Sequence, residues 1–364
     1  MEKEQAMVRD TSQHTSQADP PITRDAATQL RDLGWHDYFW DQVDPPELTQ
    51  SPPVRITQVH RNSIHIQGAD LDLMVPSLNG VTVGDWLLFN SEDPRSSQLL
   101  DRKSLIKRRA PGHDRKEQLI AANLDTAFIV SSCNNDFSVA RLERYVAMAH
   151  EADVTPVIIL TKIDLVADVG AFVSQAKTIS ERVAVVSLDA RSPSAQADLT
   201  PWCRPGQTVA FLGSSGVGKS TLANTLAGNK AIKTQEVRAT DDKGRHTTTG
   251  RQLHIMPIGC AVLDTPGMRE LQLTDVSIGL GETFADLHAL RQDCRFNNCA
   301  HDKEPGCAVQ AAIASGEVDV PRTQRWLKLV AEDLENTKLL TRRRVRDKSK
   351  NKSIKGVQNY KNKK

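Results

Sequence analysis

The 364-residue sequence is poor in aromatic residues and contains no long apolar run. Aromatic side chains make up 4% of it, beside 39% hydrophobic and 25% charged residues overall. The overall fractions are close to those of globular proteins, which excludes a chain disordered over its full length and a membrane protein. No apolar run reaches the roughly 18 residues that a membrane-spanning helix needs. We therefore expect no membrane partner.

The first residues, MEKEQ, lack the apolar core of a signal peptide. We therefore expect a cytoplasmic protein, in which thiols stay reduced. The six cysteines include Cys294, Cys299 and Cys307, which fall within fourteen residues. In a reducing compartment such a group indicates metal ligands or buried thiols before it indicates disulfides.

The net charge is only +2, but it is unevenly distributed. Residues 341–364 contain eleven Lys/Arg and one acidic residue, Asp347, so this tail carries +10 and the rest of the chain −8. Low apolar content predicts that the tail is disordered. A second basic cluster comprises Arg102, Lys103, Lys107, Arg108, Arg109, Arg115 and Lys116. Such charge suggests sequence-independent contacts with RNA phosphates, although a merely solvated tail is the alternative.

The first half of the chain is predicted to hold two regions. Residues 1–50 form an N-terminal extension, partly disordered and mostly so over residues 1–30. Its aromatic stretch 33–40 is expected to cap the next domain, and the proline pairs at 45–46 and 52–53 to mark a linker. Residues 51–110 alternate apolar and polar positions at 54–56, 64–66, 71–75 and 81–83, which predicts short strands of a small β-barrel. An oligonucleotide-binding (OB) fold is one candidate, and a purely structural barrel is the alternative.

Residues 111–280 are predicted to form an α/β domain. Apolar runs at 126–131, 157–160, 183–186, 209–212 and 260–263 are typical of strands that are buried on both faces. Between the first two runs, Val139, Leu142, Val146 and Ala149 have helical spacing. Alternating strands and helices indicate a parallel sheet with its ligand at the carboxyl edge. Residues 281–340 read as helical, with a last helix over 323–343.

One segment matches the phosphate-binding loop motif G-x-x-x-x-G-K-[ST]. It follows a predicted strand and opens a predicted helix, which is the context that the motif requires. Lys219 is expected to reach the β and γ phosphates and to act in catalysis, and the Ser220 hydroxyl to ligate Mg²⁺. The residues of the loop and its exit are Gly213, Ser214, Ser215, Gly216, Val217, Gly218, Lys219, Ser220 and Thr221.

Three further stretches could complete a nucleotide site. Thr161, Lys162, Ile163 and Asp164 follow a strand, and the Asp164 carboxylate could accept two hydrogen bonds from the edge of guanine, where adenine would leave it unpaired. Asp264 and Gly267 follow another strand, where they suit Mg²⁺ and the γ phosphate. His246 and Thr248 lie in a polar loop between these segments, and one of Thr247, Thr248 and Thr249 could ligate Mg²⁺; we assign Thr248. Each stretch alone is weak evidence.

The cysteine group and a nearby histidine could together bind a metal ion. Cys294, Cys299, His301 and Cys307 supply three thiolates and one imidazole, a set that tetrahedral Zn²⁺ accepts. Four protein ligands leave no open position, so such a site is structural. The spacing is not that of the common zinc fingers, and a chance group of buried thiols is the alternative.

Together these motifs resemble those of one family. The guanine-reading stretch precedes the phosphate loop here, whereas it comes last in ordinary GTPases. The sequence resembles the circularly permuted, ribosome small-subunit-dependent GTPase A family over about residues 33–330. The segments GSSGVGKST, GRHTTT, DTPG and CRFNNCAHDKEPGC carry the likeness. The resemblance implies an OB-like barrel, a permuted α/β P-loop GTPase domain and a helical zinc-binding domain, with one structural zinc and Mg²⁺ bound with GTP.

The sequence departs from the family pattern at three places. Thr161 stands where the family usually has Asn, for which we expect a modest loss but continued guanine preference. Ser187 and Leu188 stand where a Ser-Ala pair usually supports the base. Met268 occupies the place of a water-orienting Gln, so intrinsic hydrolysis should be slow. The resemblance suggests His246 for that catalytic task, and a structural or RNA-facing His246 is the alternative.

The sequence therefore predicts a monomeric GTPase that converts GTP to GDP and phosphate. The resemblance implies that it acts in late maturation of the small (30S) ribosomal subunit, that the subunit stimulates hydrolysis, and that the chain contacts rRNA. Two other functions remain open. One is a permuted GTPase acting on another RNA or on the large subunit. The other is an RNA-binding assembly factor that uses GTP only as a conformational ligand.

Overall fold

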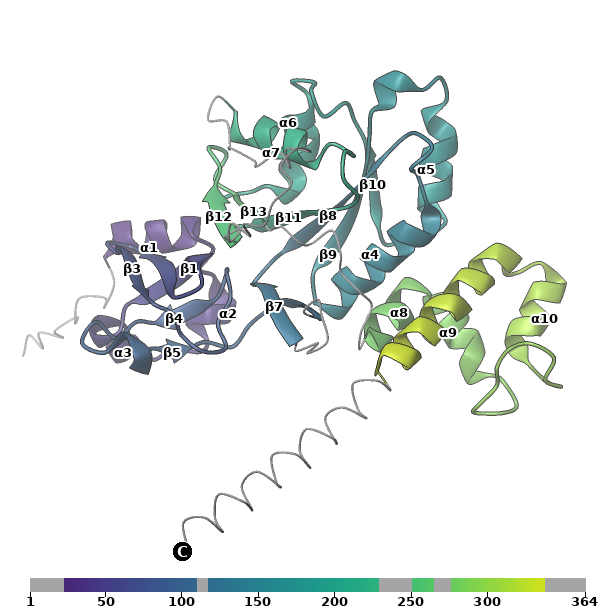
Figure 1. The fold of residues 1–364 in the computed structure, drawn as a ribbon, viewed down its shortest axis with the longest axis horizontal. Helices are drawn as coiled ribbons and strands as arrows, with labels where there is room; N and C mark the ends of the chain where they lie inside the picture. The colour runs from purple at the N-terminus through teal and green to yellow at the C-terminus, as the bar shows by residue number, and fades with distance from the viewer. Residues whose placement is uncertain (1–22, 110–116, 229–250, 265–275, 338–364) are drawn as a thin grey trace, which may run out of the picture.

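The computed structural model describes residues 23–109, 117–228, 251–264 and 276–337. Within these residues an eleven-stranded mixed sheet crosses the molecule, and its main path runs β10-β9-β8-β11-β13-β12-β1-β2-β3 (Figure 1). The C-terminal helices lie outside α4 (Val139–Glu151), which covers one face of the sheet, and the N-terminal strands lie at one end of the sheet. In the part of the chain that the structure describes, no helix is long and apolar enough to cross a membrane.

The α/β part confirms the five predicted strands, although the one at 184–187 is only partly buried. The parallel strands are β8 (Thr126–Ser132), β9 (Thr155–Thr161), β10 (Ala184–Ser187), β11 (Thr208–Leu212) and β13 (Ala261–Asp264). The carboxyl ends of parallel strands meet at one edge of a sheet. That edge therefore carries the segments after β9, β11 and β13, where the sequence predicts nucleotide contacts.

Helices cover both faces of these strands (Figure 1). On one face alternate strand residues such as Ile129 and Ile158 pack with α4 (Val139–Glu151) and α5 (Val169–Lys177). On the other face Phe128 and Val157 pack with α6 (Ala195–Leu199) and α7 (Lys219–Ala227). Successive side chains of a strand point to opposite faces, so a strand covered on both sides must be apolar throughout. Short 3₁₀ turns occupy Pro94–Ser96, Ile163–Leu165 and Thr200–Trp202.

The N-terminal strands form an antiparallel unit around its own apolar cluster. They are β1 (Pro53–Val59), β2 (Ser63–Gly68), β3 (Asp72–Pro76), β4 (Trp86–Leu88) and β5 (Gln98–Leu99). A strand at 81–83 was also expected, and that prediction is wrong. There the chain turns, because the Asp85 carboxylate accepts a hydrogen bond from Thr82 N at 2.7 Å. The fourth strand forms after this turn, at Trp86–Leu88.

Two predictions for the N-terminal extension need correction. Residues 24–30, expected to be disordered, belong to α1 (Arg24–Asp32), which Thr23 caps and which buries Leu30. Residues 1–22 lie outside the described residues. The proline pairs mark no irregular linker, because Pro45 opens α3 (Pro45–Gln50) and Pro53 opens β1. Proline is tolerated at the first position of a helix or a strand.

The aromatic stretch caps the N-terminal β unit, as the sequence predicts. It includes α2 (Asp37–Trp40). Trp35 and Phe39 are buried against Trp86 of β4, with ring centroids 4.9 and 5.7 Å from that of Trp86. Trp35 and Phe39 thus pack in the core between this stretch and the β unit.

The sheet continues across the predicted domain boundary at residue 110. β12 (Arg251–Ile255) pairs with β13 on one side and with β1 on the other. A hairpin of β6 (Leu105–Arg109) and β7 (Glu117–Ala122) leads into the α/β part. Near this junction the fully buried Arg55 donates to the carbonyl oxygens of Leu33 and Asn123, at 2.5 and 3.1 Å. The two parts are therefore joined by backbone pairing and by a buried cation.

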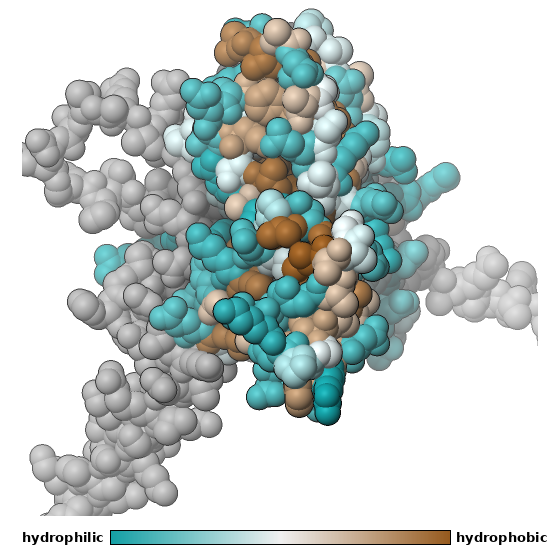
Figure 2. Space-filling view, turned by 90° about the vertical axis from the view of Figure 1, so that its right-hand side faces the viewer, coloured by the Kyte–Doolittle hydropathy of each residue, from teal (hydrophilic) through white to brown (hydrophobic). Residues whose placement is uncertain are grey.

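The C-terminal helices share a core with one face of the sheet. They are α8 (Ser277–Thr283), α9 (Ala285–Gln292), α10 (Ala308–Ser315) and a helix over 320–337. A Cβ on Gly279 would lie 1.9 Å from the Ala147 carbonyl oxygen, so α8 approaches α4 closely only because it has glycine there. On the outer face of α5 and these helices, hydrophobic residues lie in separate groups among hydrophilic ones (Figure 2). The part of the predicted last helix beyond 337 lies outside the described residues.

Candidate nucleotide site and cysteine–histidine centre

The phosphate loop lies between β11 and α7, as its motif requires. Gly213 and Gly218 have φ angles of +136° and +104°, in a region that residues with a side chain rarely adopt. A Cβ on Gly213 would also lie 2.2 Å from the Val130 carbonyl oxygen. The two glycines therefore allow the loop to turn tightly against β8. Helix α7 begins at Lys219, so its free N–H groups lie at the end of the loop.

The side chains of the loop have defined partners. The Lys219 ammonium donates to the carbonyl oxygen of Gly213 at 2.8 Å and also to that of Ser214. Ser220, in the first turn of α7, is exposed, as are Ser215 and Gly216. A cation over the loop and an accessible hydroxyl beside it are the groups that a phosphate–Mg²⁺ complex needs.

The predicted base-reading stretch lies beside the phosphate loop. Thr161, at the end of β9, is fully buried, and its hydroxyl donates to the carbonyl oxygen of Val217 at 2.6 Å. Lys162 takes a left-handed conformation with φ of +57°, and Asp164 follows in a 3₁₀ turn. The left-handed residue turns the chain away from the sheet directly after the strand. Residues 161 and 217 are far apart in the sequence, so the fold brings these two motifs together.

Asp164 is held by a residue that the sequence did not indicate. The Arg191 guanidinium donates to Asp164 Oδ2 at 2.7 Å, and it lies 3.4 Å from Asp189. The loop carrying Arg191 is tied to α7 by Thr225, whose hydroxyl donates to the Ala190 carbonyl oxygen at 2.7 Å. In the loop after β10, Leu188 N donates to the carbonyl oxygen of Leu160 at 2.9 Å. No motif marked Arg191, because only the tertiary fold places it beside Asp164.

The structure describes the remaining predicted nucleotide residues only in part. Asp264 ends β13, whose residue Leu263 is in register with Ala210 of β11, so its backbone lies at the edge that carries the phosphate loop. The Asp264 side chain lies outside the described residues. So do His246, Thr248, Gly267 and Met268.

The four predicted metal ligands do converge. One ligand atom from each of Cys294, Cys299, His301 and Cys307 lies within 4.8 Å of the others. His301 Nδ1 is 3.5 Å from the sulfur of Cys294 and 3.4 Å from that of Cys307. Tetrahedral zinc holds its ligand atoms about 2.0–2.3 Å away, which separates them by roughly 3.5 Å. The donor set therefore fits one such ion.

The surroundings favour the zinc-binding protonation state at His301 and Cys294 and oppose it at Cys299. Burial lowers the pKa of His301 below its ordinary value, which keeps the imidazole neutral. Burial opposes ionisation of Cys294, but hydrogen bonds from the Val309 and Ala308 N–H groups outweigh it, and its pKa lies below the ordinary value. Burial and the neighbouring Cys307 raise the pKa of Cys299 to about 11, despite a hydrogen bond from the backbone of His301. Neutral imidazole and thiolate are the ligand forms of these side chains.

The turn around the donors is fixed by nearby groups. His301 has φ of +60°, and its carbonyl oxygen accepts a hydrogen bond from Gln310 Nε2 at 2.6 Å. The Glu304 carboxylate accepts from the backbone N–H of Ala300 at 2.8 Å and of Asp302 at 3.0 Å. The His301 ring centroid lies 5.4 Å from that of Trp326, which belongs to the helix over 320–337. The centre is therefore joined to the last helix.

Part of the second basic cluster is already paired within the chain. Arg102 donates to both carboxylate oxygens of the buried Asp85, at 2.7 and 2.8 Å. Lys103 pairs with Asp125 at 2.8 Å. These two cations stabilise the junction after the N-terminal β unit. Residues 110–116 and the tail from 338 lie outside the described residues.

Known proteins match this chain over most of its length. A family model described as RsgA GTPase matches residues 99–274. A "Small ribosomal subunit biogenesis GTPase RsgA 2" of Vibrio parahaemolyticus is 44% identical over 92% of this chain and 94% of its own. A "Small ribosomal subunit biogenesis GTPase RsgA" of Mesorhizobium japonicum is 47% identical over 86% of this chain and 92% of its own.

Solved structures show the same fold. The crystal structure of YloQ, described as a circularly permuted GTPase, has a TM-score of 0.53 at 25% identity and covers 78% of this chain and 96% of its own. That of YjeQ from Thermotoga maritima has a TM-score of 0.57 at 24% identity over 78% of this chain and 98% of its own. These findings confirm the permuted fold and the predicted family. The chain belongs to the RsgA GTPase family, and it is a GTP hydrolase.

Proposed function

We propose that this chain is a Mg²⁺-dependent GTPase that acts as a monomer in late maturation of the small ribosomal subunit. It binds the subunit in the GTP state, hydrolyses GTP faster when bound there, and leaves in the GDP state. The names of its relatives support this role, since they are small ribosomal subunit biogenesis GTPases. Action on the ribosomal subunit implies a cytoplasmic location.

The hydrogen bond between Thr161 and the carbonyl oxygen of Val217 is the observation that carries the proposal. It joins the stretch that would read the base to the loop that would bind the phosphates. Asp164 would accept the N1–H and N2–H₂ groups of guanine, and Lys162 would lie along the purine face. Adenine would leave the carboxylate unpaired, so GTP is favoured over ATP. Thr161, which stands in the place of the usual Asn, makes this connection.

The phosphate end uses the groups at the start of α7. Lys219 would contact the β and γ phosphates, with Thr221 in the turn behind it, and the accessible Ser220 hydroxyl would ligate Mg²⁺. We assign the carboxylate of Asp264 and the hydroxyl of Thr248 to the same ion, the Gly267 N–H to the γ phosphate, and His246 to the attacking water. The ion neutralises charge that develops on the phosphates during transfer.

We also propose one structural zinc per chain, held by the three thiolates and His301. Because four protein donors fill a tetrahedral shell, such an ion fixes the loop between α9 and α10 and takes no part in hydrolysis. We further infer that the basic tail and the second cluster contact rRNA phosphates. That binding should weaken steeply as salt rises.

The test is the GTPase rate of the full chain alone, with isolated small subunits, and with isolated large subunits. Small subunits should raise the rate well above that of the chain alone, and large subunits should not. The Lys219→Ala variant with small subunits measures any contaminating activity. Stimulation by large subunits alone, or by neither, would contradict the proposed partner. Undiminished subunit assembly with Lys219→Ala would favour GTP as a conformational ligand only.

A further inference from the structure

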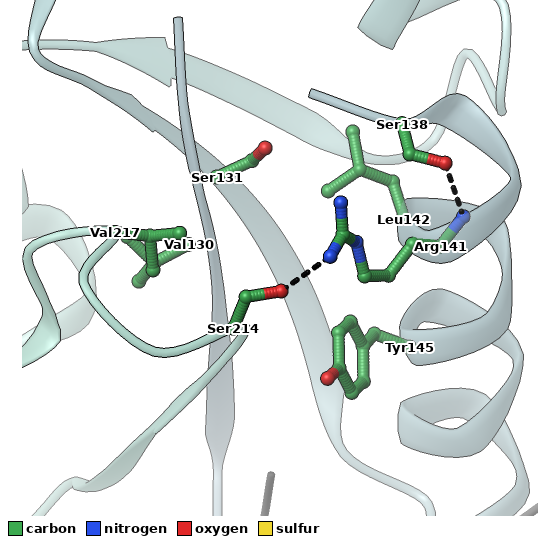
Figure 3. Close-up of a pocket in the computed structure, with 8 residues that line it drawn as sticks. All are labelled: Val130, Ser131, Ser138, Arg141, Leu142, Tyr145, Ser214 and Val217. Carbon is green, nitrogen blue, oxygen red and sulfur yellow. Dashed lines mark hydrogen bonds between the residues drawn. The ribbon is translucent and has the colours of Figure 1, made fainter. Parts of the chain in front are cut away.

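The first turn of α4 places an arginine against the phosphate loop (Figure 3). Arg141 Nη1 donates to the hydroxyl of Ser214, the second residue of the loop, at 2.6 Å. The two residues are 73 positions apart in the chain. Neither the loop motif nor the strand pattern requires an arginine at this place. Nothing in the GTPase chemistry described above uses it.

The Arg141 side chain is held on both sides. Its Nη2 donates to Asp136 Oδ1 at 3.0 Å and also to the Asp136 carbonyl oxygen. The guanidinium lines a small hollow between α4, β8 and the loop (Figure 3), whose other walls include Val130, Leu142 and Val217. About a third of the side chain, 35%, remains exposed. A guanidinium fixed by Asp136 gives up little further side-chain entropy when it bonds to Ser214.

Helix α4 is itself fixed at its middle. Arg325 Nε donates to the fully buried carboxylate of Glu143 at 2.8 Å. Arg144 forms a two-pronged ion pair with Glu332, with both distances 2.6 Å. Both partners belong to the helix over 320–337, so the position of Arg141 is set by the body of the protein. The position of Arg141 therefore does not depend on the conformation of the phosphate loop.

The phosphate loop is thus held at two points by side chains from neighbouring strand ends. Thr161, the last residue of β9, holds the carbonyl oxygen of Val217 in the second half of the loop. Arg141, after β8, holds Ser214 in its first half. A loop whose N–H groups already point at the phosphates needs no rearrangement during the reaction, and this lowers the barrier. We propose that Arg141 is a positioning residue for GTP hydrolysis, acting through the hydroxyl of Ser214.

The inference rests on the GTPase activity, and the test uses the full-length chain. Arg141→Ala, Ser214→Ala and the double variant are compared with wild type in kcat and KM for GTP and in melting temperature. Arg141→Ala should lower kcat/KM about tenfold, which is the scale of a charge-assisted hydrogen bond. Ser214→Ala should reproduce most of that loss, and the double variant should lose no more than Arg141→Ala alone.

Two further variants separate positioning from general effects. Arg141→Lys keeps a cationic donor that can reach Ser214 and should recover kcat/KM to within about threefold of wild type. Arg182→Ala removes an exposed arginine elsewhere on the surface and should leave kcat/KM unchanged.

A purely structural role would lower the melting temperature of Arg141→Ala, and kcat/KM would not fall to a matching degree in Ser214→Ala. That result, additive losses in the double variant, or an unchanged kcat/KM in Arg141→Ala would overturn the inference. A wild-type chain without GTPase activity would instead contradict the proposed function.

Discussion

The two sites of this protein are assembled in opposite ways. The cysteine–histidine centre takes all four donors from residues 294–307, so a short loop can form it. The nucleotide site takes Thr161 and Asp164 from the end of one strand and the phosphate loop from the end of another, more than fifty residues later. A local site depends on its ligand and its turn, whereas a convergent site depends on the packed sheet. Chain order is therefore free in the second case, provided that each loop keeps its place at the sheet edge.

The largest expected effect concerns the local site. Cys307→Ser should reduce bound zinc from one per chain to near zero, because binding of structural zinc contributes on the order of 10 kcal/mol to folding of such units. Elemental analysis would show the loss of metal, and circular dichroism would show the loss of helix content. Cys203→Ala, which removes a buried thiol outside the centre, should keep its zinc. If the sites are separate in the way described, affinity for GDP in Cys307→Ser stays within about threefold of wild type.

The next effect concerns the convergent site. Lys219→Ala removes the ammonium that the loop itself carries, which donates to the carbonyl oxygens of Gly213 and Ser214, and it should lower the GTPase rate by about 100-fold or more. Bound zinc should stay at one per chain. The exposed Lys177→Ala serves as the matched control and should turn over GTP like wild type. A fall of less than about threefold in the GTPase rate of Lys219→Ala would contradict the assignment of this loop as the phosphate-binding loop.

A smaller effect is expected where the two motifs of the nucleotide site meet. Thr161→Val keeps the shape of the side chain but removes the hydrogen bond to the buried carbonyl oxygen of Val217. An unpaired buried acceptor costs about 1–2 kcal/mol, so GDP affinity should weaken by roughly tenfold, as measured by fluorescence titration. Thr161→Asn can restore a donor, and its affinity should return to near that of wild type. Equal affinities in all three proteins would show that the bond does not shape the site.

The smallest effect lies in the C-terminal unit. Burial opposes ionisation of Asp286, but hydrogen bonding and charge from Arg322 outweigh it, so its pKa lies below the ordinary value of 3.8. The ionised carboxylate therefore stabilises the fold above about pH 4, and this stabilisation is lost as pH falls through the folded pKa. The side chain is half exposed, so Asp286→Asn should cost less than about 1 kcal/mol at pH 7. Urea unfolding at pH 7 and pH 3 should show a smaller difference from wild type at the lower pH.

Strands and site residues could be predicted from the sequence where a short stretch of residues indicates them by itself. The phosphate loop, the five parallel strands and the four metal donors were all predicted from short stretches of sequence, because the spacing of residues within each stretch indicates them. The strand expected at 81–83 failed because the Asp85 carboxylate competes for Thr82 N. Short β12, with only Leu253 buried, gave no periodic signal.

Other features depend on contacts between residues that are far apart in the sequence, which no short stretch of sequence reveals. Arg141 and Arg191 take their roles from partners 73 and 27 residues away, so only the fold reveals them. The pairing of β12 with β1 continues the sheet across the expected boundary, and it too is determined by the tertiary fold. The buried Arg55 would pass as a surface residue of a strand in the sequence.

The central claim is that the two separated motifs read one guanosine nucleotide. It is tested most directly by displacing a fluorescent GDP analogue with GTP, ATP and xanthosine triphosphate, in wild type and in Asp164→Asn. Wild type should prefer GTP over ATP by about 100-fold or more. Asp164→Asn should lose at least tenfold in GTP affinity and gain for xanthosine triphosphate, whose base offers an acceptor in place of the amino group. Equal displacement by ATP and GTP in wild type, or unchanged GTP affinity in Asp164→Asn, would contradict the account.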